Sequence, residues 1–223
     1  MGKIRLLGWP CHRILALMIG ALVLIGCGGR SEDADPPPVR PAAGPSAAGP
    51  ACVARLGASG ALFARQAAFS TAQGCGIRNP VEVSRAATLP LSQPAVMDCA
   101  LAEAVAAYEA RILIPAARFH LGTSIEQIDH WGTYACRGRS SDRSRLSEHA
   151  FGRAIDIAGF RTRDGRRITV ARHWRDPGPE GRFIRDVATG ACGIFSVVLG
   201  PGSDRFHQNH LHLDIGPSRL CRP

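Results

Sequence analysis

Residues 207–215 read HQNHLHLDI and residues 147–156 read SEHAFGRAID, and these two stretches decide the expected fold. In the first of them, His210, His212 and Asp214 alternate with leucine and isoleucine, which is the period-two pattern of a strand with one buried face. The two imidazoles and the carboxylate would then share the opposite face. Such a face is either a metal half-site or an ordinary solvated strand face.

The stretch 147–156 places further ligand types beside a second expected strand. Ile155 and Ile157 flank Asp156, so we expect its carboxylate to point away from their core face. His149 lies on the approach to the same strand, with Gly152 between them where the chain must bend closely. Taken alone, each of these polar residues is more often a surface residue than a ligand.

Together the two stretches offer His149, Asp156 and His212 as a ligand set. Zinc prefers tetrahedral nitrogen and oxygen ligands, and a catalytic zinc site has three protein ligands and one open position. A metal in such a site lowers the pKa of water to about 7 and polarises a carbonyl group. We therefore expect a zinc cofactor and the chemistry of amide hydrolysis.

The rest of the chain indicates an α+β domain with helices packed on a small antiparallel sheet. Apolar residues at helical spacing, among them Phe119, predict a helix from Ala95 to about His120, which Pro115 should kink or divide. Asp164-Gly165 is typical of a hairpin turn. Strands are expected at 125–130, 154–160, 167–170, 195–199 and 211–215, and a further helix at 180–187.

Residues 1–26 are typical of a signal peptide: a basic start and an apolar run too short to span a bilayer. Leu24-Ile25-Gly26-Cys27 resembles a bacterial lipobox, so we expect cleavage before Cys27 and acylation of its thiol. An ordinary secretory leader is the alternative. Residues 27–51, rich in proline, alanine and glycine, should form a tether, and residues 52–223 one folded domain.

Export also determines how the cysteines are interpreted. Six remain in the domain, an even number in an oxidising compartment, so we expect three disulfides rather than a thiolate zinc site. Six cysteines allow 15 pairings, and we favour Cys136 with Cys192 because that bond would brace the segment before the proposed site. The six are Cys52, Cys75, Cys99, Cys136, Cys192 and Cys221.

The net charge of +9 comes from scattered arginines rather than a basic stripe with interleaved aromatic residues. This distribution gives no support to nucleic-acid binding. Attraction to an anionic cell wall or membrane surface remains compatible with it.

The motif S-x-H-x-x-G-x-A-x-D followed by H-x-H resembles lysostaphin-like and D-Ala-D-Ala metallopeptidases of the hedgehog-like fold. The wider stretch from Cys75 through residues 134–137 and 198–201 to Asp214 is similar to the bacterial extensin-like C-terminal family. This resemblance implies zinc on His149, Asp156 and His212. The dipeptidase branch has a glutamate base where this chain has Asn209, so the base role moves to His210.

Penicillin-insensitive murein endopeptidases have a spacing similar to His207-x-x-His210-x-His212, which favours an endopeptidase. The resemblance further implies that His207 donates to substrate or orients His210, and that Ser147 and Asp214 support the ligands. Arg137 is the candidate cation for the oxyanion, although it could equally belong to an arginine-rich surface loop, and Arg139, Arg143 and Arg145 compete with it.

These expectations describe a periplasm-facing, membrane-anchored lipoprotein of the cell envelope that hydrolyses peptide cross-bridges of peptidoglycan, with or without a protein activator. The alternative is a wall-binding or regulatory lipoprotein with a structural zinc site. A zinc hydrolase acting on another wall amide or ester is a third possibility.

Overall fold

The computed structural model describes residues 48–223. The expected signal peptide, the expected lipidation site Cys27 and most of the expected tether lie outside these residues. Helix α1 (Ala48–Ala58) includes residues 48–51, which we expected in the tether. The helix packs on the domain because Cys52 and Leu56, on its inner side, are buried there. Within residues 48–223, no helix combines the length and apolar character that a membrane span requires.

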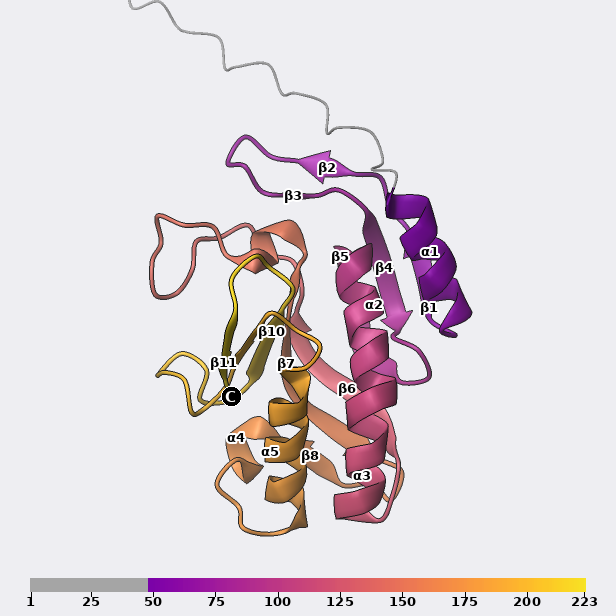
Figure 1. The fold of residues 1–223 in the computed structure, drawn as a ribbon, viewed down its shortest axis with the longest axis vertical. Coiled ribbons are helices and arrows are strands. Elements are labelled where there is room, and N and C mark those ends of the chain that lie inside the picture. The colour runs from indigo at the N-terminus through magenta and orange to yellow at the C-terminus, as the bar shows by residue number, and fades with distance from the viewer. Residues whose placement is uncertain (1–47) are drawn as a thin grey trace, which may run out of the picture. The chain divides into compact units, whose positions relative to one another are not determined.

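The domain combines helices with one large sheet, which confirms the expected α+β class (Figure 1). Its strands are β1 (Leu62–Arg65), β2 (Phe69–Ser70), β3 (Gly76–Ile77), β4 (Pro80–Arg85), β5 (Pro90–Asp98), β6 (Ile125–Gly132), β7 (Ala154–Thr162), β8 (Arg167–Thr169), β9 (Val197–Leu199), β10 (Leu211–Asp214) and β11 (Leu220–Arg222). Besides α1, its helices are α2 (Cys99–Tyr108), a π-helical segment (Glu109–Leu113), α3 (Ile114–Leu121), a 3-10 helix (Glu148–Phe151), α4 (Val170–His173) and α5 (Pro179–Ala191).

The sheet is larger than expected and mixed rather than purely antiparallel. Its order is β1-β4-β5-β6-β7-β10-β9-β11, with β8 also paired to β7. β5 and β6 are parallel because helices α2 and α3 form the crossover between them. β9 pairs antiparallel with β10 on one edge and parallel with β11 on the other. The expected hairpin at Asp164-Gly165 does join β7 to β8, with Gly165 at φ 86°.

The long helical stretch begins later than expected. β5 continues to Asp98, whose side chain caps α2 by accepting a hydrogen bond from the amide of Ala100 at 3.0 Å. Pro115 divides the stretch, as expected, since the π-helical segment lies immediately before it. The wider π turn shifts the phase of the following turns. Phe119, one of the apolar residues that predicted the helix, is therefore 83% exposed and not part of the core.

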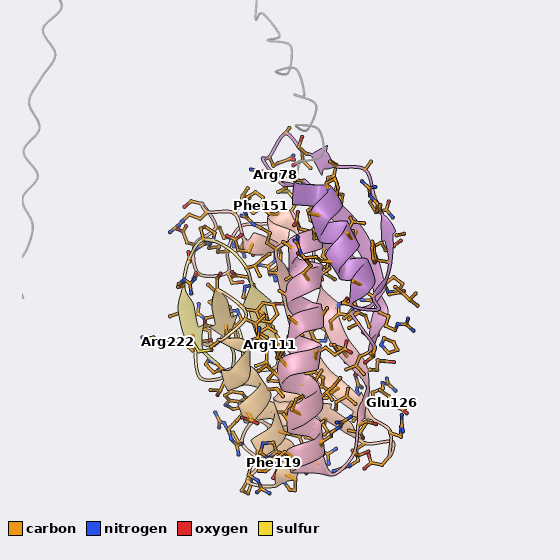
Figure 2. All side chains as sticks on the ribbon, turned by 45° about the vertical axis from the view of Figure 1, so that its right-hand side comes forward. Arg78, Arg111, Phe119, Glu126, Phe151 and Arg222 are labelled. Carbon is orange, nitrogen blue, oxygen red and sulfur yellow. A yellow bond between two sulfur atoms is a disulfide. The ribbon has the colours of Figure 1, made fainter. Side chains whose placement is uncertain are left out.

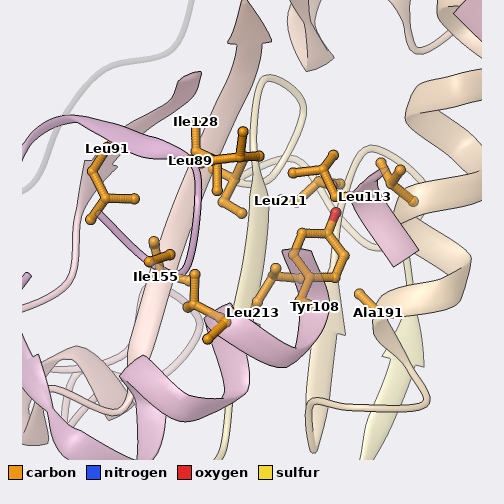
Figure 3. Close-up of a cluster of buried hydrophobic side chains, with 14 of the residues drawn as sticks. Leu89, Leu91, Tyr108, Leu113, Ile128, Ile155, Ala191, Leu211 and Leu213 are labelled. Atoms are coloured by element: carbon orange, nitrogen blue, oxygen red, sulfur yellow. The ribbon is translucent and has the colours of Figure 1, made fainter. Parts of the chain in front are cut away.

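The helices cover one face of the central strands. Ile155 from β7 and Leu211 and Leu213 from β10 are fully buried, and they share one core with Tyr108 and Leu113 of the helical stretch (Figure 3). Because side chains alternate along a strand, Asp156, His212 and Asp214 project from the opposite face of the sheet.

Three disulfides link Cys52 to Cys99, Cys75 to Cys136 and Cys192 to Cys221. The expected number is confirmed, and the favoured pairing of Cys136 with Cys192 is wrong. Cys192 ends α5 next to β11, which carries Cys221, whereas Cys136 lies beside the β2–β3 hairpin, which carries Cys75.

Candidate metal centre

Strands β7 and β10 place two of the expected ligands side by side. Their antiparallel register pairs Asp156 directly with His212. Their neighbours in each strand are core isoleucines and leucines, so both polar side chains face away from the helices. The backbone pairing therefore fixes the carboxylate and the imidazole as neighbours.

His149 reaches the same point from the approach to β7, where we expected it, and this approach is a 3-10 helix. Ser147 caps this helix, its hydroxyl accepting a hydrogen bond from the His149 amide at 3.4 Å. Gly152 ends the helix in the left-handed region at φ 61°, and a β-carbon there would lie 2.5 Å from Ile77 Cδ1. Both termini of this short helix thus hold the His149 side chain in position.

The three candidate ligand atoms form a nearly equilateral triangle. His149 Nε2 lies 3.1 Å from Asp156 Oδ1 and 3.2 Å from His212 Nδ1, and His212 Nδ1 lies 3.0 Å from Asp156 Oδ1. Ligands of a tetrahedral zinc ion with bonds of 2.0–2.1 Å lie about 3.3 Å apart. The group could hold a metal ion with little rearrangement.

The second nitrogen of each imidazole faces an acceptor outside the triangle. His149 Nδ1 lies 3.2 Å from the Thr133 carbonyl oxygen, and His212 Nε2 lies 3.1 Å from Asp214 Oδ2. Each of these outer nitrogens must carry a proton to donate, so in the neutral rings the inner nitrogens carry lone pairs. Two lone pairs and a carboxylate then converge, an arrangement that a cation stabilises.

The same crowding shifts the pKa values in the metal-free protein. Burial acts to raise the pKa of Asp156, but hydrogen bonds from His149 and His212 outweigh it and hold that pKa far below its usual range. Burial acts to lower the pKa of His212, but hydrogen bonds to Asp156 and Asp214 outweigh it and raise the pKa to about 9. A proton on His212 therefore supplies the positive charge when no metal does.

Two further histidines, both expected at the site, flank the triangle. His210 Nδ1 lies 3.0 Å from Asn209 Oδ1, which leaves its Nε2 facing Asp156 Oδ1 at 3.6 Å. Burial lowers the pKa of His210, so the ring is neutral and can accept a proton at neutral pH. The exposed Trp131 packs against His210 with ring centroids 5.1 Å apart.

His207 is oriented by an acidic residue that we did not predict. Its Nδ1 donates to Asp204 Oδ1 at 2.8 Å, so Nε2 is the free nitrogen, and its ring centroid lies 5.8 Å from that of His212. The spacing of three residues between Asp204 and His207 is a signal that could have been recognised. The Thr133 backbone carbonyl, which faces His149 Nδ1, could not be recognised from the sequence.

A cavity of about 500 Å³ opens beside the triangle, lined by His207, His212 and Asp214 among others. Arg137 and Ser147 lie on its wall, and among residues 48–223 the Arg137 guanidinium donates a hydrogen bond only to the Gly138 carbonyl, at 3.4 Å. Of the competing arginines, Arg139 also lines the cavity and Arg143 and Arg145 do not.

Glu148, the acidic neighbour of His149 in sequence, does not face the three candidate ligand atoms. Its carboxylate pairs with Arg153 at 2.7 Å and with Arg139 at 3.6 Å. The 3-10 helix and these two arginines direct the Glu148 side chain away from the three candidate ligand atoms.

These features define an α+β domain, linked by three disulfides, that carries a candidate metal centre on the open face of its sheet. The chain belongs to the family described as extensin-like protein C-terminus, whose model matches residues 50–222. Neither a curated protein nor a solved structure matches the chain.

Proposed function

We propose that the protein is a zinc-dependent hydrolase that cuts peptide cross-bridges of bacterial peptidoglycan. The observation that carries the proposal is the triangle of His149 Nε2, Asp156 Oδ1 and His212 Nδ1, with edges of 3.0–3.2 Å and an open cavity at its side. A structural zinc site is closed by four protein ligands, whereas a catalytic site keeps one position open. Three ligands beside a cavity favour the catalytic kind.

The resemblance of the two motifs to hedgehog-like zinc peptidases supports the same proposal. Motif residues from Ser147 to Asp156 surround the 3-10 helix and the start of β7, and the H-x-H residues lie at the start of β10. The candidate ligand side chains converge from these positions. The proposed relationship to the hedgehog-like fold rests on this placement of the two motifs.

When bound, zinc would polarise the amide carbonyl and lower the pKa of a water molecule. His210 accepts the proton of the attacking water at Nε2, since Asn209 holds its Nδ1–H. It then returns the proton to the leaving amine. His207, whose Nδ1–H is held by Asp204, donates to the substrate from Nε2 when its ring is protonated, and Arg137 on the cavity wall stabilises the oxyanion.

A histidine base favours an endopeptidase over a dipeptidase. The residue three positions before His212 is Asn209, which has no titratable group, and Glu148 is paired with arginines. The acylated Cys27 and the tether would place this activity at the periplasmic side of a membrane, where peptidoglycan is within reach.

The first test is metal content. We expect about one zinc ion per full-length chain by mass spectrometry under native conditions, from the three-ligand count. His149→Ala should lose the metal. His120→Ala, whose ring pairs with Asp186 away from the site, is the matched control and should keep it. A metal-free wild type after purification in zinc-containing buffer would contradict the proposal.

The second test is digestion of purified sacculi by the full-length, zinc-loaded chain. We expect new muropeptide ends that disappear with chelator and in His210→Ala, which should still bind zinc but lose about 100-fold or more in kcat. Binding to sacculi without any cleavage would instead support a wall-binding lipoprotein with a structural zinc site.

A further inference from the structure

The cavity beside the metal centre has walls from three separate parts of the chain: the loop after β6, the loop before β10, and the C-terminal segment. Val197, Leu199 and Leu220 provide apolar surface within it. The remaining lining residues are mostly charged or small and polar. Their charge balance indicates which ligand the cavity can hold.

Every acidic side chain of the cavity already has a side-chain partner. Glu148 pairs with Arg153 at 2.7 Å. Asp204 pairs with His207 at 2.8 Å, and Asp214 accepts a hydrogen bond from His212 at 3.1 Å. All three carboxylates are therefore held by other side chains before any ligand arrives.

Three arginines on the same wall have no such compensation. Arg137, Arg219 and Arg222 are exposed and form no ion pair with any residue of the described range 48–223. Uncompensated guanidinium groups around a concave surface create a positive potential, which the low-dielectric walls focus into the cavity. Each guanidinium can also donate two parallel hydrogen bonds to one carboxylate.

The two C-terminal arginines belong to a fixed element of the fold. Arg222 lies on β11, which pairs with β9 and is bonded through Cys221 to the end of α5. Figure 2 shows Arg222 at the outer edge of the sheet. Arg219 immediately precedes this strand, so both side chains are presented from a constrained backbone.

We infer that this cavity selects peptides that carry free carboxylates on one side of the hydrolysed amide, and that Arg219 and Arg222 are its specificity-determining residues. The inference rests on the proposed function and names its substrate class. In this binding mode the amide to be hydrolysed lies at the candidate metal centre. The free carboxylates of the same peptide lie in the cavity, where the two arginines bind them.

The test compares two ligands that differ only in charge: muropeptides released from sacculi, and the same muropeptides with their carboxylates amidated. Binding to the full-length chain is measured by titration calorimetry after zinc removal, so no cleavage interferes. We expect the free carboxylates to bind about tenfold or more tightly, the effect of one charge-assisted hydrogen bond. The double variant Arg219→Ala/Arg222→Ala should reduce that ratio to about twofold or less.

The matched control is Arg111→Ala/Arg163→Ala, which removes two exposed arginines outside the cavity and should keep the wild-type ratio. Figure 2 shows Arg111 on the helical stretch. If the alanine pair fails to fold, Arg219→Lys/Arg222→Lys retains the charge without the planar fork and should give an intermediate ratio.

Equal binding of the two muropeptide sets by the wild type would overturn the inference, whether or not sacculi are cleaved. Tighter binding of inorganic polyphosphate than of the acidic muropeptides would also overturn it, in favour of a phosphate-rich polymer. Charge-selective binding without cleavage of sacculi would refute the proposed hydrolase and leave the inference standing.

Discussion

Asp214 contacts the metal centre only through His212, whose Nε2 it faces at 3.1 Å, and its other oxygen accepts from the Gly216 amide at 2.8 Å. Asp214→Asn keeps the shape but removes the charge that makes the imidazole a stronger ligand. We expect zinc affinity to fall about 10- to 100-fold, as for other partners of ligand histidines. Competition with a chromogenic chelator measures the change.

The control for Asp214→Asn is Asp164→Asn in the β7–β8 turn, which leaves the metal centre untouched. Unchanged zinc affinity in Asp214→Asn would mean that His212 is held by the strand pairing alone.

His212 also makes the unfolding free energy of the metal-free protein depend on pH. Its folded pKa of about 9 lies above the ordinary value of 6.5, so its contribution to stability is complete below pH 6.5 and is lost as the pH rises through 9. We expect the unfolding free energy of the metal-free wild type to fall over this window. His212→Ala should lack this loss.

Urea denaturation at several pH values between 6 and 10 tests this prediction. Zinc should reverse the trend, because deprotonated imidazoles bind the metal and its affinity therefore rises with pH. Parallel pH profiles of metal-free wild type and His212→Ala would contradict the prediction.

The expected ligand residues were accessible from the sequence because their chemistry is local. Alternation around Asp156 and His212 reveals which face of a strand each occupies. The carbonyl of Thr133 and the pairing of Glu148 with arginines depend on the folded chain, so no pattern of residue types could reveal them.

At the scale of elements, Gly152 couples the 3-10 helix of His149 to the rest of the domain. Gly152→Ala would force a side chain into the left-handed region and place its Cβ 2.5 Å from Ile77 Cδ1 and 3.0 Å from the Asp98 amide nitrogen. We expect a loss of about 2–4 kcal/mol in unfolding free energy, together with weaker zinc binding because His149 shifts.

Gly165→Ala is a matched control for this substitution. Gly165 is also left-handed, at φ 86°, but a β-carbon there meets nothing within 4 Å. Its cost should be about 1 kcal/mol, and zinc binding should not change. Equal losses in both variants, measured by urea denaturation, would show that the contact with Ile77 is easily relieved.

The element boundaries that the sequence missed have identifiable causes. The apolar run before Cys99 fits a strand as well as a helix, and only the Asp98 cap separates the two. The π-helical segment is held by long-range contacts: the buried Glu109 carboxylate accepts hydrogen bonds from the amides of Ala87, Thr88 and Leu89. Periodicity within one segment cannot indicate such contacts.

At the scale of the whole molecule, the α+β class followed from the succession of elements, but the size of the sheet did not. Strand β1 has only four residues and strands β4 and β5 contain prolines, so all three give a weak periodic signal. Their pairing into the sheet depends on contacts distant in sequence. The disulfide connectivity also depends on contacts distant in sequence. The sequence alone therefore led us to favour a wrong pair, Cys136 with Cys192.

That connectivity has a consequence for how the protein is made. The bonds Cys52–Cys99 and Cys75–Cys136 interleave along the chain. Cysteines oxidised in the order in which they emerge during synthesis would pair Cys52 with Cys75, and Cys99 with Cys136. Both bonds are non-native and must be reshuffled by thiol–disulfide exchange, which takes seconds to hours.

Biogenesis should therefore depend on a disulfide isomerase as well as an oxidase. We expect that protein synthesised in vitro under oxidising conditions without isomerase accumulates Cys52–Cys75 and Cys99–Cys136 bonds detectable by peptide mapping, while Cys192–Cys221 forms correctly because its partners are consecutive. Efficient native pairing by the oxidant alone would show that folding brings the interleaved cysteines together before oxidation. If the interleaved bonds instead form only with an isomerase, the yield of folded protein would report the isomerase capacity of the compartment in which the chain folds.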